Sequence, residues 1–315
     1  MAGPNPPIAI VGAGMAGVSA AMRLAELGRE VVIHESGDQV GGRMASTLLN
    51  GRRYDHGAQF FTTRSAEFTS LVEEAVADGA VHAWTSGFED PPDGYPRWAG
   101  TTSMVDLVEW MARRGGVVTR LGSCIDDLHE LEAAALILTA PVPESLSLLT
   151  RSDMLPEPVL HHRLAAIHYK PTIAVLAATD SSPDALPAHG GVQYLDHPDL
   201  AFVTDNARKG ISDQACLTIH LSNSLSSELW TATDDAIVER ARALTALLLG
   251  TASIREATVV RWRYAGPVET DPERCVIFGA APIIGLAGEA FGGPKVEGAF
   301  HSGRAAAEAI DAALS

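Results

Sequence analysis

Basic residues are scarce in this sequence. It carries 23 Lys and Arg against 39 Asp and Glu, a net charge of −16 at pH 7, and its lysines are only Lys170, Lys209 and Lys295. Nucleic acids and anionic membrane surfaces bind net basic faces, so this balance argues against both as partners. We therefore expect neither as a partner.

Cysteines and long apolar runs are also few. Cys124, Cys216 and Cys275 are scattered and not at metal-ligand spacing, which fits a reducing compartment and predicts no metal site. The longest apolar run, Ala133 to Val142, is too short to span a bilayer. The opening MAGPNPP lacks a basic run followed by an apolar stretch. We therefore expect a cytoplasmic protein, while oligomeric state is left open.

The two ends of the chain share one pattern of buried strands, glycine turns and small-residue helices, and the middle has another pattern. The apolar run Ile8–Val11, the turn GAGMAG, the helix VSAAMRLAELG and the strand EVVIHE make a βαβ unit. Around 105–150, TSMVDLVEWMARRGG predicts a helix, VVTRLGSCIDDL a strand or hairpin, and ALILTAP a buried strand. From Cys275 the pattern of the N-terminal end returns, and the chain ends in a helix of small residues.

The middle region predicts an antiparallel sheet. We interpret HHRLAAIHYKPTIAVLAATD, LAFVTDNAR, ACLTIHLS and ATVVRWRYAGP as strands, and DDAIVERARALTALLLG as an amphipathic helix. The predicted fold class is α/β: a Rossmann-type nucleotide domain with an inserted α+β substrate domain built on an antiparallel sheet. We assign 1–70, 105–150 and 270–315 to the first domain, and 71–104 and 151–269 to the second.

The glycine turn carries the first functional signal. Gly12 permits the tight turn, Gly14 lets a pyrophosphate approach the backbone, and Gly17 lets helix and strand pack closely. The phosphates then meet the positive end of the helix. Glu35, 23 residues after Gly12, ends the second strand and can accept hydrogen bonds from a ribose. A dinucleotide is the predicted ligand.

Two further glycine-rich stretches favour FAD over NAD. GGR (Gly41 to Arg43) offers a second close approach to a pyrophosphate and adds a cation, for which a plain NAD-binding domain has no use. In AGEAFGGPKVEGAFHSGRAAA, a helix beginning near Val296 would aim its positive end at an acceptor such as a flavin carbonyl.

Together these motifs resemble the renalase-type branch of the flavin amine oxidase superfamily. The resemblance covers nearly the whole chain, and GAQFFT and RWRYA are the stretches that point to this branch. It implies FAD, a nucleotide domain of GR2 type, a substrate sheet of six or seven strands, and electrons returned to O2. No cysteine or histidine stands at an evident flavinylation position, so we expect the FAD to be non-covalent. One departure is visible: AGE (Ala287 to Glu289) stands where the superfamily commonly carries Gly-Asp.

The resemblance also gives YDHGAQFF (Tyr54 to Phe61) a role, because in this family the GAQ loop lies against the flavin ring. Gly57 and Ala58 would lack bulk so that the ring can approach, and Gln59 would offer polarity to the ring edge or the substrate. The FAD contacts that we predict are Gly12, Gly14, Met15, Ala16, Gly17, Glu35, Ser36, Gly41, Gly42, Arg43, Met44, Gly57, Ala58, Gln59, Phe60, Ile125, Ala140, Pro141, Gly288, Glu289, Lys295, Val296 and Glu297.

The reaction is the least determined part. Many amine oxidases keep a lysine beside flavin N5, yet Lys170 and Lys209 look like a strand start and a loop residue, and Lys295 belongs to the cofactor loop. Renalase-type enzymes oxidise misreduced 2- or 6-dihydro isomers of NAD(P)H, which need a flat slot rather than a base. The residues that we predict around that slot are Gln59, Trp98, Tyr194, Trp262, Tyr264 and Phe291.

Other residues and other functions stay open at this point. His220 and His301 are possible substrate partners, but we favour a structural role for both. For Arg52, Arg64 and Arg208 we favour a solvated surface role over contacts with substrate phosphates. An amine or amino-acid oxidase is the alternative enzyme. A non-catalytic FAD-binding regulator is the alternative outside enzymes, and only tests with electron donors separate these.

Overall fold

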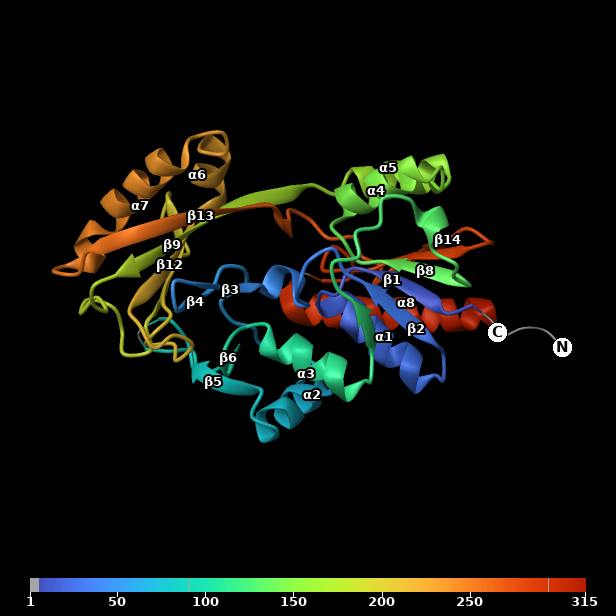
Figure 1. Cartoon of the computed structure of the whole chain (residues 1–315), viewed down its shortest axis with the longest axis horizontal. Coiled ribbons are helices and arrows are strands. Elements are labelled where there is room, and N and C mark those ends of the chain that lie inside the picture. The colour runs from blue at the N-terminus through green and yellow to red at the C-terminus, as the bar shows by residue number, and fades with distance from the viewer. Residues whose placement is uncertain (1–5, 90, 294) are drawn as a thin grey trace.

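The structure is a computed structural model, and it describes residues 6–89, 91–293 and 295–315. Two larger sheets lie toward opposite ends of the molecule, and long strands of one sheet run toward the other (Figure 1). Within the described ranges, no helix is long and apolar enough to cross a membrane.

The first sheet has six strands and a parallel centre. Strand β1 (Ile8–Val11) lies between β2 and β8 and runs parallel to both. The full order is β14 (Val276–Phe278), β15 (Ile283–Leu286), β8 (Ala135–Leu138), β1, β2 (Val31–His34) and β7 (Val118–Arg120), with β14 antiparallel to its neighbour. From β1 the chain continues to β2 on one side, and it later forms β8 on the other side of β1. Sheets of this kind bind ligands at the carboxyl ends of the two strands where the order reverses, here β1 and β8.

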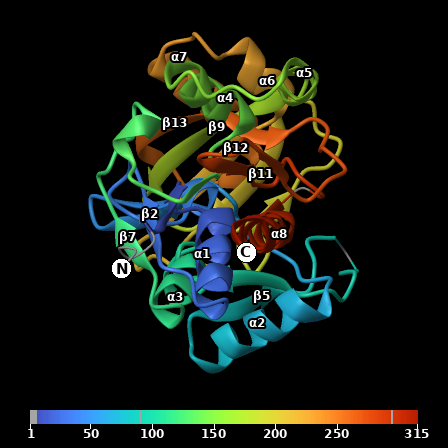
Figure 2. The same ribbon diagram turned by 90° about the vertical axis from the view of Figure 1, so that its right-hand side faces the viewer.

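Helices cover both faces of this sheet (Figures 1 and 2). On one face lie α1 (Met15–Glu26), α3 (Asp106–Arg114) and α8 (Lys295–Leu314); on the other lie α4 (Val142–Arg151) and α5 (Pro158–Ala165). Helices α1 and α8 touch closely, because a Cβ on Gly303 would lie 2.1 Å from the Ala16 carbonyl oxygen. Across the same contact, the Ser19 hydroxyl donates to the Phe300 carbonyl at 2.7 Å.

The second sheet has five antiparallel strands and one covered outer face. Its order is β10 (Gly191–Gln193), β11 (Leu200–Asp205), β12 (Cys216–Leu221), β9 (Tyr169–Thr179) and β13 (Ile254–Pro267). Helices α6 (Asn223–Glu228) and α7 (Asp234–Leu249) cover the outer face, where Val175, Ile219 and Ile237 share an apolar cluster. On the inner face, Leu176 and Cys216 pack instead with Tyr54.

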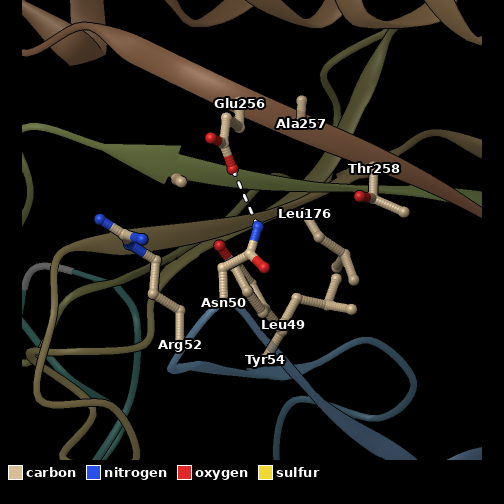
Figure 3. A pocket seen from close by; sticks show the side chains of 9 residues that line it. Leu49, Asn50, Arg52, Tyr54, Leu176, Glu256, Ala257 and Thr258 are labelled. Atoms are coloured by element: carbon tan, nitrogen blue, oxygen red, sulfur yellow. Dashed lines mark hydrogen bonds between the residues drawn. The ribbon is translucent and has the colours of Figure 1, made fainter.

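The chain between β2 and α3 forms two hairpins and a helix. They are β3 (Ser46–Leu49) with β4 (Arg52–Asp55), β5 (Val81–Thr85) with β6 (Arg97–Gly100), and α2 (Ala66–Ala77); single 3-10 turns occupy Gly42–Met44 and Leu128–Glu130. At the turn of the first hairpin the Asn50 amide donates to Glu256 of β13 at 3.1 Å (Figure 3). This contact lines a hollow of about 20 Å³, room for roughly one water molecule.

The predicted fold class is confirmed, with corrections in detail. HHRLAA, predicted as the start of a strand, lies largely in α5, and β9 begins only at Tyr169. The predicted strand or hairpin after residue 117 shrinks to β7. The described residues give the second sheet five strands rather than six or seven. The domain division stays a prediction; Phe68, Val72 and Trp84, from the segment around α2 and β5, pack in the same cluster as α1.

Candidate functional site

The carboxyl ends of the parallel strands gather the predicted cofactor residues at one edge. Gly12 follows β1, Glu35 follows β2, Thr139 follows β8, and Gly288 lies just beyond β15. Thr139 joins two of these strands, because its hydroxyl lies 3.0 Å from the Val11 carbonyl oxygen and 3.1 Å from that of Gly12. Residues far apart in the sequence therefore meet at the ligand edge of the sheet.

The three fingerprint glycines are required for different reasons. A Cβ on Gly17 would lie 2.0 Å from the Gly12 carbonyl oxygen, and Gly12 itself has a φ of +104°. Gly14 has an ordinary φ of −75°, and a Cβ there would meet nothing closer than the Gly42 Cα at 3.9 Å. Gly14 also provides no side-chain cap for α1. The chain leaves open space and an uncapped helix end there, which fits a pyrophosphate.

The second glycine stretch lies beside the first. The Gly41 N–H donates to the Ala13 carbonyl at 2.9 Å, so GAG and GGR face the same space. Glu35 holds this arrangement, since its carboxylate accepts from the Ala13 N–H at 2.7 Å and from the Gly37 N–H at 2.8 Å. Ser36 donates weakly to the same carboxylate, at 3.3 Å.

Arg43 and Glu289 lie against each other. The guanidinium donates to both oxygens of the carboxylate, and it also donates to the Tyr264 carbonyl at 3.2 Å. The sequence predicts a separate contact with FAD for each of these two residues. Glutamate in place of aspartate has an arm long enough to reach Arg43, and both contacts with FAD stay predictions.

The loop 55–59 is bound into the protein by a buried ion pair. The ammonium of Lys209 lies 2.6 Å from the Asp55 carboxylate and 2.6 Å from the Gln59 carbonyl oxygen, and neither charged side chain is exposed. Asp55 also accepts from the Ser46 hydroxyl and from the Met104 N–H. Burial lowers the pKa of Lys209, and the Asp55 carboxylate opposes that shift.

Gly57 and Gln59 also have roles inside the protein, and their contacts with FAD stay predictions. Gly57 is glycine for an internal reason, because a Cβ there would lie 2.1 Å from the Arg43 carbonyl oxygen, the same oxygen that accepts from the Ala58 N–H. The Gln59 amide nitrogen does not point outward: it donates to the Asp55 carbonyl at 2.7 Å and the Gly57 carbonyl at 3.1 Å. Within the described residues, the Gln59 Oε1 is buried without a partner.

The carbonyl of His56 is held by two residues of the second sheet. The Trp262 indole N–H donates to it at 2.9 Å, and the His220 Nε2 lies 3.1 Å away. A carbonyl only accepts, so His220 carries its hydrogen on Nε2; burial lowers the pKa of His220 to about 4 and keeps it neutral. The His56 ring stacks on Trp262 with centroids 5.4 Å apart, and burial lowers its pKa as well.

The predicted aromatic slot is only partly assembled. Trp262 faces the loop, and Tyr264 packs edge-on against Tyr169 at 5.6 Å. Trp98 pairs through its backbone with Phe61. Tyr194 packs instead with the cluster under α7, and Phe291, only 2 % exposed, lies in the core with α4. Tyr194 directly follows β10 and packs with Val192 on the helix-covered face, and Phe291 packs against β8, β15 and α4.

The remaining predicted residues have identifiable surroundings. Phe60 packs against Phe88 and Phe202 at 5.0 and 6.0 Å, Glu297 accepts from the Ser65 N–H, and Arg208 donates to the Leu186 carbonyl. His301 contacts Ser65 and two glutamates, as a structural histidine would. Several of these residues stand at the ends of elements: Met15 and Ala16 begin α1, Ala140 and Pro141 follow β8, and Lys295 and Val296 begin α8. Met44 is buried, and Ile125 packs near β1. Arg52 contacts the Ala215 carbonyl, and Arg64 lies over Tyr95.

Sequence reasoning missed Lys209. The sequence indicates a loop residue, and the turn after β11 does hold it, but the side chain points inward and reaches Asp55 at the end of β4. The scarcity of lysine was the available signal. In a chain with only three lysines, each one is a candidate for a specific role.

Two family patterns match this chain. That of the NAD(P)-binding Rossmann-like domain covers residues 10–75, where the glycine loops and Glu35 lie. That of flavin containing amine oxidoreductases covers residues 103–311, about two thirds of the chain. The chain belongs to the flavin containing amine oxidoreductase family. FAD is therefore the cofactor, and its binding at the glycine edge stays a prediction.

Relatives in this family are distant. Putrescine oxidase of Kocuria rosea is 29 % identical over 132 residues, which is 37 % of this chain and 26 % of the relative. The chain thus matches about a quarter of that relative's length. A putrescine oxidase structure bound to putrescine has a TM-score of 0.69 at 16 % identity, covering 98 % of this chain and 99 % of the other. Cyclohexylamine oxidase from Brevibacterium oxydans IH-35A gives 0.68 at 14 %, covering 99 % and 100 %.

These structural matches establish the fold of the flavin containing amine oxidoreductases over the whole chain. The largest predicted feature, a nucleotide sheet with a separate substrate sheet, is therefore shared with amine oxidases. The renalase-type branch and its substrate remain proposals.

Proposed function

We propose that the chain is an FAD-dependent oxidase that removes a hydride from a dihydropyridine nucleotide. The substrates would be the 2- or 6-dihydro isomers of NAD(P)H, and the products NAD(P)+ and H2O2. The support is the family, the renalase-type stretches GAQFFT and RWRYA, and the state of the ionisable groups around the loop 55–59.

That state is the observation on which the proposal depends. Asp55 is bound by Lys209, Ser46 and the Met104 N–H, and Glu289 by Arg43. His56 and His220 have pKa values lowered by burial. Among the described residues at this loop, each carboxylate and ammonium already has a partner. A substrate that must lose a proton finds no free carboxylate there and only neutral histidines, which the lowered pKa values make weak bases, whereas a dihydropyridine nitrogen is already unprotonated.

The chain's own residues would then bind and orient. The glycine edge with Glu35 would hold the dinucleotide, and the loop 55–59 would lie along the flavin ring. Trp262, stacked on His56, offers an aromatic plane that suits a flat ring. When bound, FAD accepts the hydride and returns two electrons to O2. Holding the donor about 3–3.5 Å from the acceptor in the reactive pose is the protein's main contribution.

An amine oxidase is the second candidate. It is favoured by the family match and by the shared fold of putrescine and cyclohexylamine oxidases. Trp262, Tyr264 and Tyr169 could then form an aromatic wall for an uncharged amine. An alkyl amine has a pKa near 10, so the site would have to favour the deprotonated form.

The test is anaerobic mixing of the yellow holoprotein with a panel of donors, followed by flavin absorbance. We expect 2- or 6-dihydro-NAD(P) to bleach the flavin quickly and ordinary 4-dihydro NADH to do so poorly. Bleaching by simple amines, with the nicotinamide isomers inactive, would establish the second candidate instead. A flavin that no donor reduces would favour a regulatory protein.

A further inference from the structure

A fully buried lysine is left unused by the proposed reaction. Lys209 lies in the turn that follows β11, and its ammonium lies 2.6 Å from both the Asp55 carboxylate and the Gln59 carbonyl oxygen. It also lies 4.9 Å from the centre of the Trp84 ring, which belongs to β5. One side chain thus contacts two segments, the loop 55–59 and β5, that are distant from it in sequence.

The contacts of Lys209 close the neck of the loop 55–59. Asp55 and Gln59 are the two ends of that loop, and the ammonium bridges them. A second bridge joins the same two residues, because the Gln59 amide donates to the Asp55 carbonyl at 2.7 Å. Between them, His56, Gly57 and Ala58 form the tip.

The tip is held from the same sheet. His220 of β12 and Trp262 of β13 both contact the His56 carbonyl, at 3.1 and 2.9 Å. Strand β12 pairs directly with β11, whose turn carries Lys209. The second sheet and its β11 turn therefore fix the loop at both neck and tip, although the loop lies in the range 1–70 that we assign to the nucleotide domain.

We propose that Lys209 is a positioning residue that sets the orientation of the loop 55–59 toward the flavin. The inference rests on the proposed function in one respect, that this loop faces the flavin ring. A purely stabilising role explains less, since a buried ion pair is often no more stable than an apolar pair of similar volume. Neutralising Asp55 would also not require the contact with the Gln59 carbonyl.

The test compares holoproteins of Lys209→Met, of the double variant Asp55→Asn/Lys209→Met, and of Lys170→Met. The double variant removes both charges, so that folding does not depend on an unpaired buried carboxylate. Lys170→Met is the matched control, because Lys170 is exposed on β9. The measurements are the visible spectrum and reduction potential of bound FAD, and kcat and KM with a 2- or 6-dihydro-NAD(P) donor.

We expect the double variant to bind FAD with an altered spectrum and potential, and with kcat per bound FAD lowered about a hundredfold, as a displacement of about 1 Å can do. KM should stay within about threefold, and Lys170→Met should match the wild type. A double variant that loses only thermal stability, with wild-type spectrum, potential and kcat, would overturn the proposal. If no donor reduces the wild type, the proposed function fails, while a changed spectrum and potential would still support the role of Lys209.

Discussion

Gly14 and Gly17 belong to one motif, yet the chain itself explains only Gly17. A Cβ on Gly17 would overlap the Gly12 carbonyl oxygen, whereas a Cβ on Gly14 would have open space around it. The absent side chain at Gly14 therefore serves something that is not part of the protein. We expect Gly14→Ala to leave the stability of the apoprotein unchanged and to weaken FAD binding at least tenfold, because the new methyl occupies pyrophosphate space.

The comparison needs two more variants, measured by thermal unfolding of the apoprotein and by FAD titration. Gly17→Ala should lower stability by about 1–3 kcal/mol through overpacking. Gly266→Ala, where a Cβ meets nothing within 4 Å, should change neither quantity. Equal FAD affinity in Gly14→Ala and wild type would contradict the assignment of this edge to the pyrophosphate.

Glu35 gives a second test at the scale of the residue. Its carboxylate already orders the turn through the Ala13 and Gly37 N–H groups, and a ribose would add donors to the same oxygens. Glu35→Ala should weaken FAD binding by about 1.5–3 kcal/mol, the range for hydrogen bonds with a charged partner. FAD titration measures this, with Glu30→Ala, exposed at the other end of β2, as the control. An unchanged affinity would remove Glu35 from the site.

Among the elements, those with a clear hydrophobic period could be predicted from the sequence. The strand β1 and helices α1, α3, α7 and α8 follow from apolar spacing and glycine stops. Helix α5 could not be found in this way, because HHRLAA runs into the apolar residues of β9 without a turn signal. Its start is marked by Pro158 at the first helical position and by the Glu157 side chain, which caps α5 through the Val159 and Leu160 N–H groups.

Strand β12 carries a pH-dependent element, since burial lowers the pKa of His220 to about 4. The ordinary value is 6.5, so between about pH 4 and 6.5 the unfolded chain binds more protons than the folded one. Stability should therefore rise with pH through this window and be fully present above it, with His220 contributing about 3 kcal/mol. Urea unfolding at several pH values measures this slope.

His220→Gln is the variant that isolates this effect. Glutamine can still donate to the His56 carbonyl but does not titrate, so its stability should depend less steeply on pH over the same window. Parallel curves for the variant and the wild type would show that His220 does not titrate as inferred.

At the scale of the whole molecule, the cofactor edge was largely predictable and the substrate side was not. Gly12, Gly14, Gly17 and Glu35 lie in one βαβ unit, so local spacing locates them. The pairs Lys209–Asp55 and Trp262–His56 join residues 154 and 206 positions apart, and only the docking of two sheets brings them together. Local patterns carry no information on that docking, which is why Tyr194 and Phe291 were wrongly grouped with Trp262.

Trp262 and Tyr194 lie on opposite faces of the second sheet, and this difference allows a test of the reaction. If hydride transfer needs orientation rather than a base, its rate should depend on the Trp262 plane and hardly on pH. In anaerobic stopped-flow with a 2- or 6-dihydro-NAD(P) donor, Trp262→Ala should slow flavin reduction about a hundredfold. Tyr194→Ala, on the helix-covered face of the same sheet, should not. Between about pH 6.5 and 9 the wild-type rate should stay flat, because His56 and His220 are already neutral there. A rate that climbs tenfold per pH unit would mean that the substrate must first lose a proton, as an amine does, and the aromatic plane would then belong to an amine site.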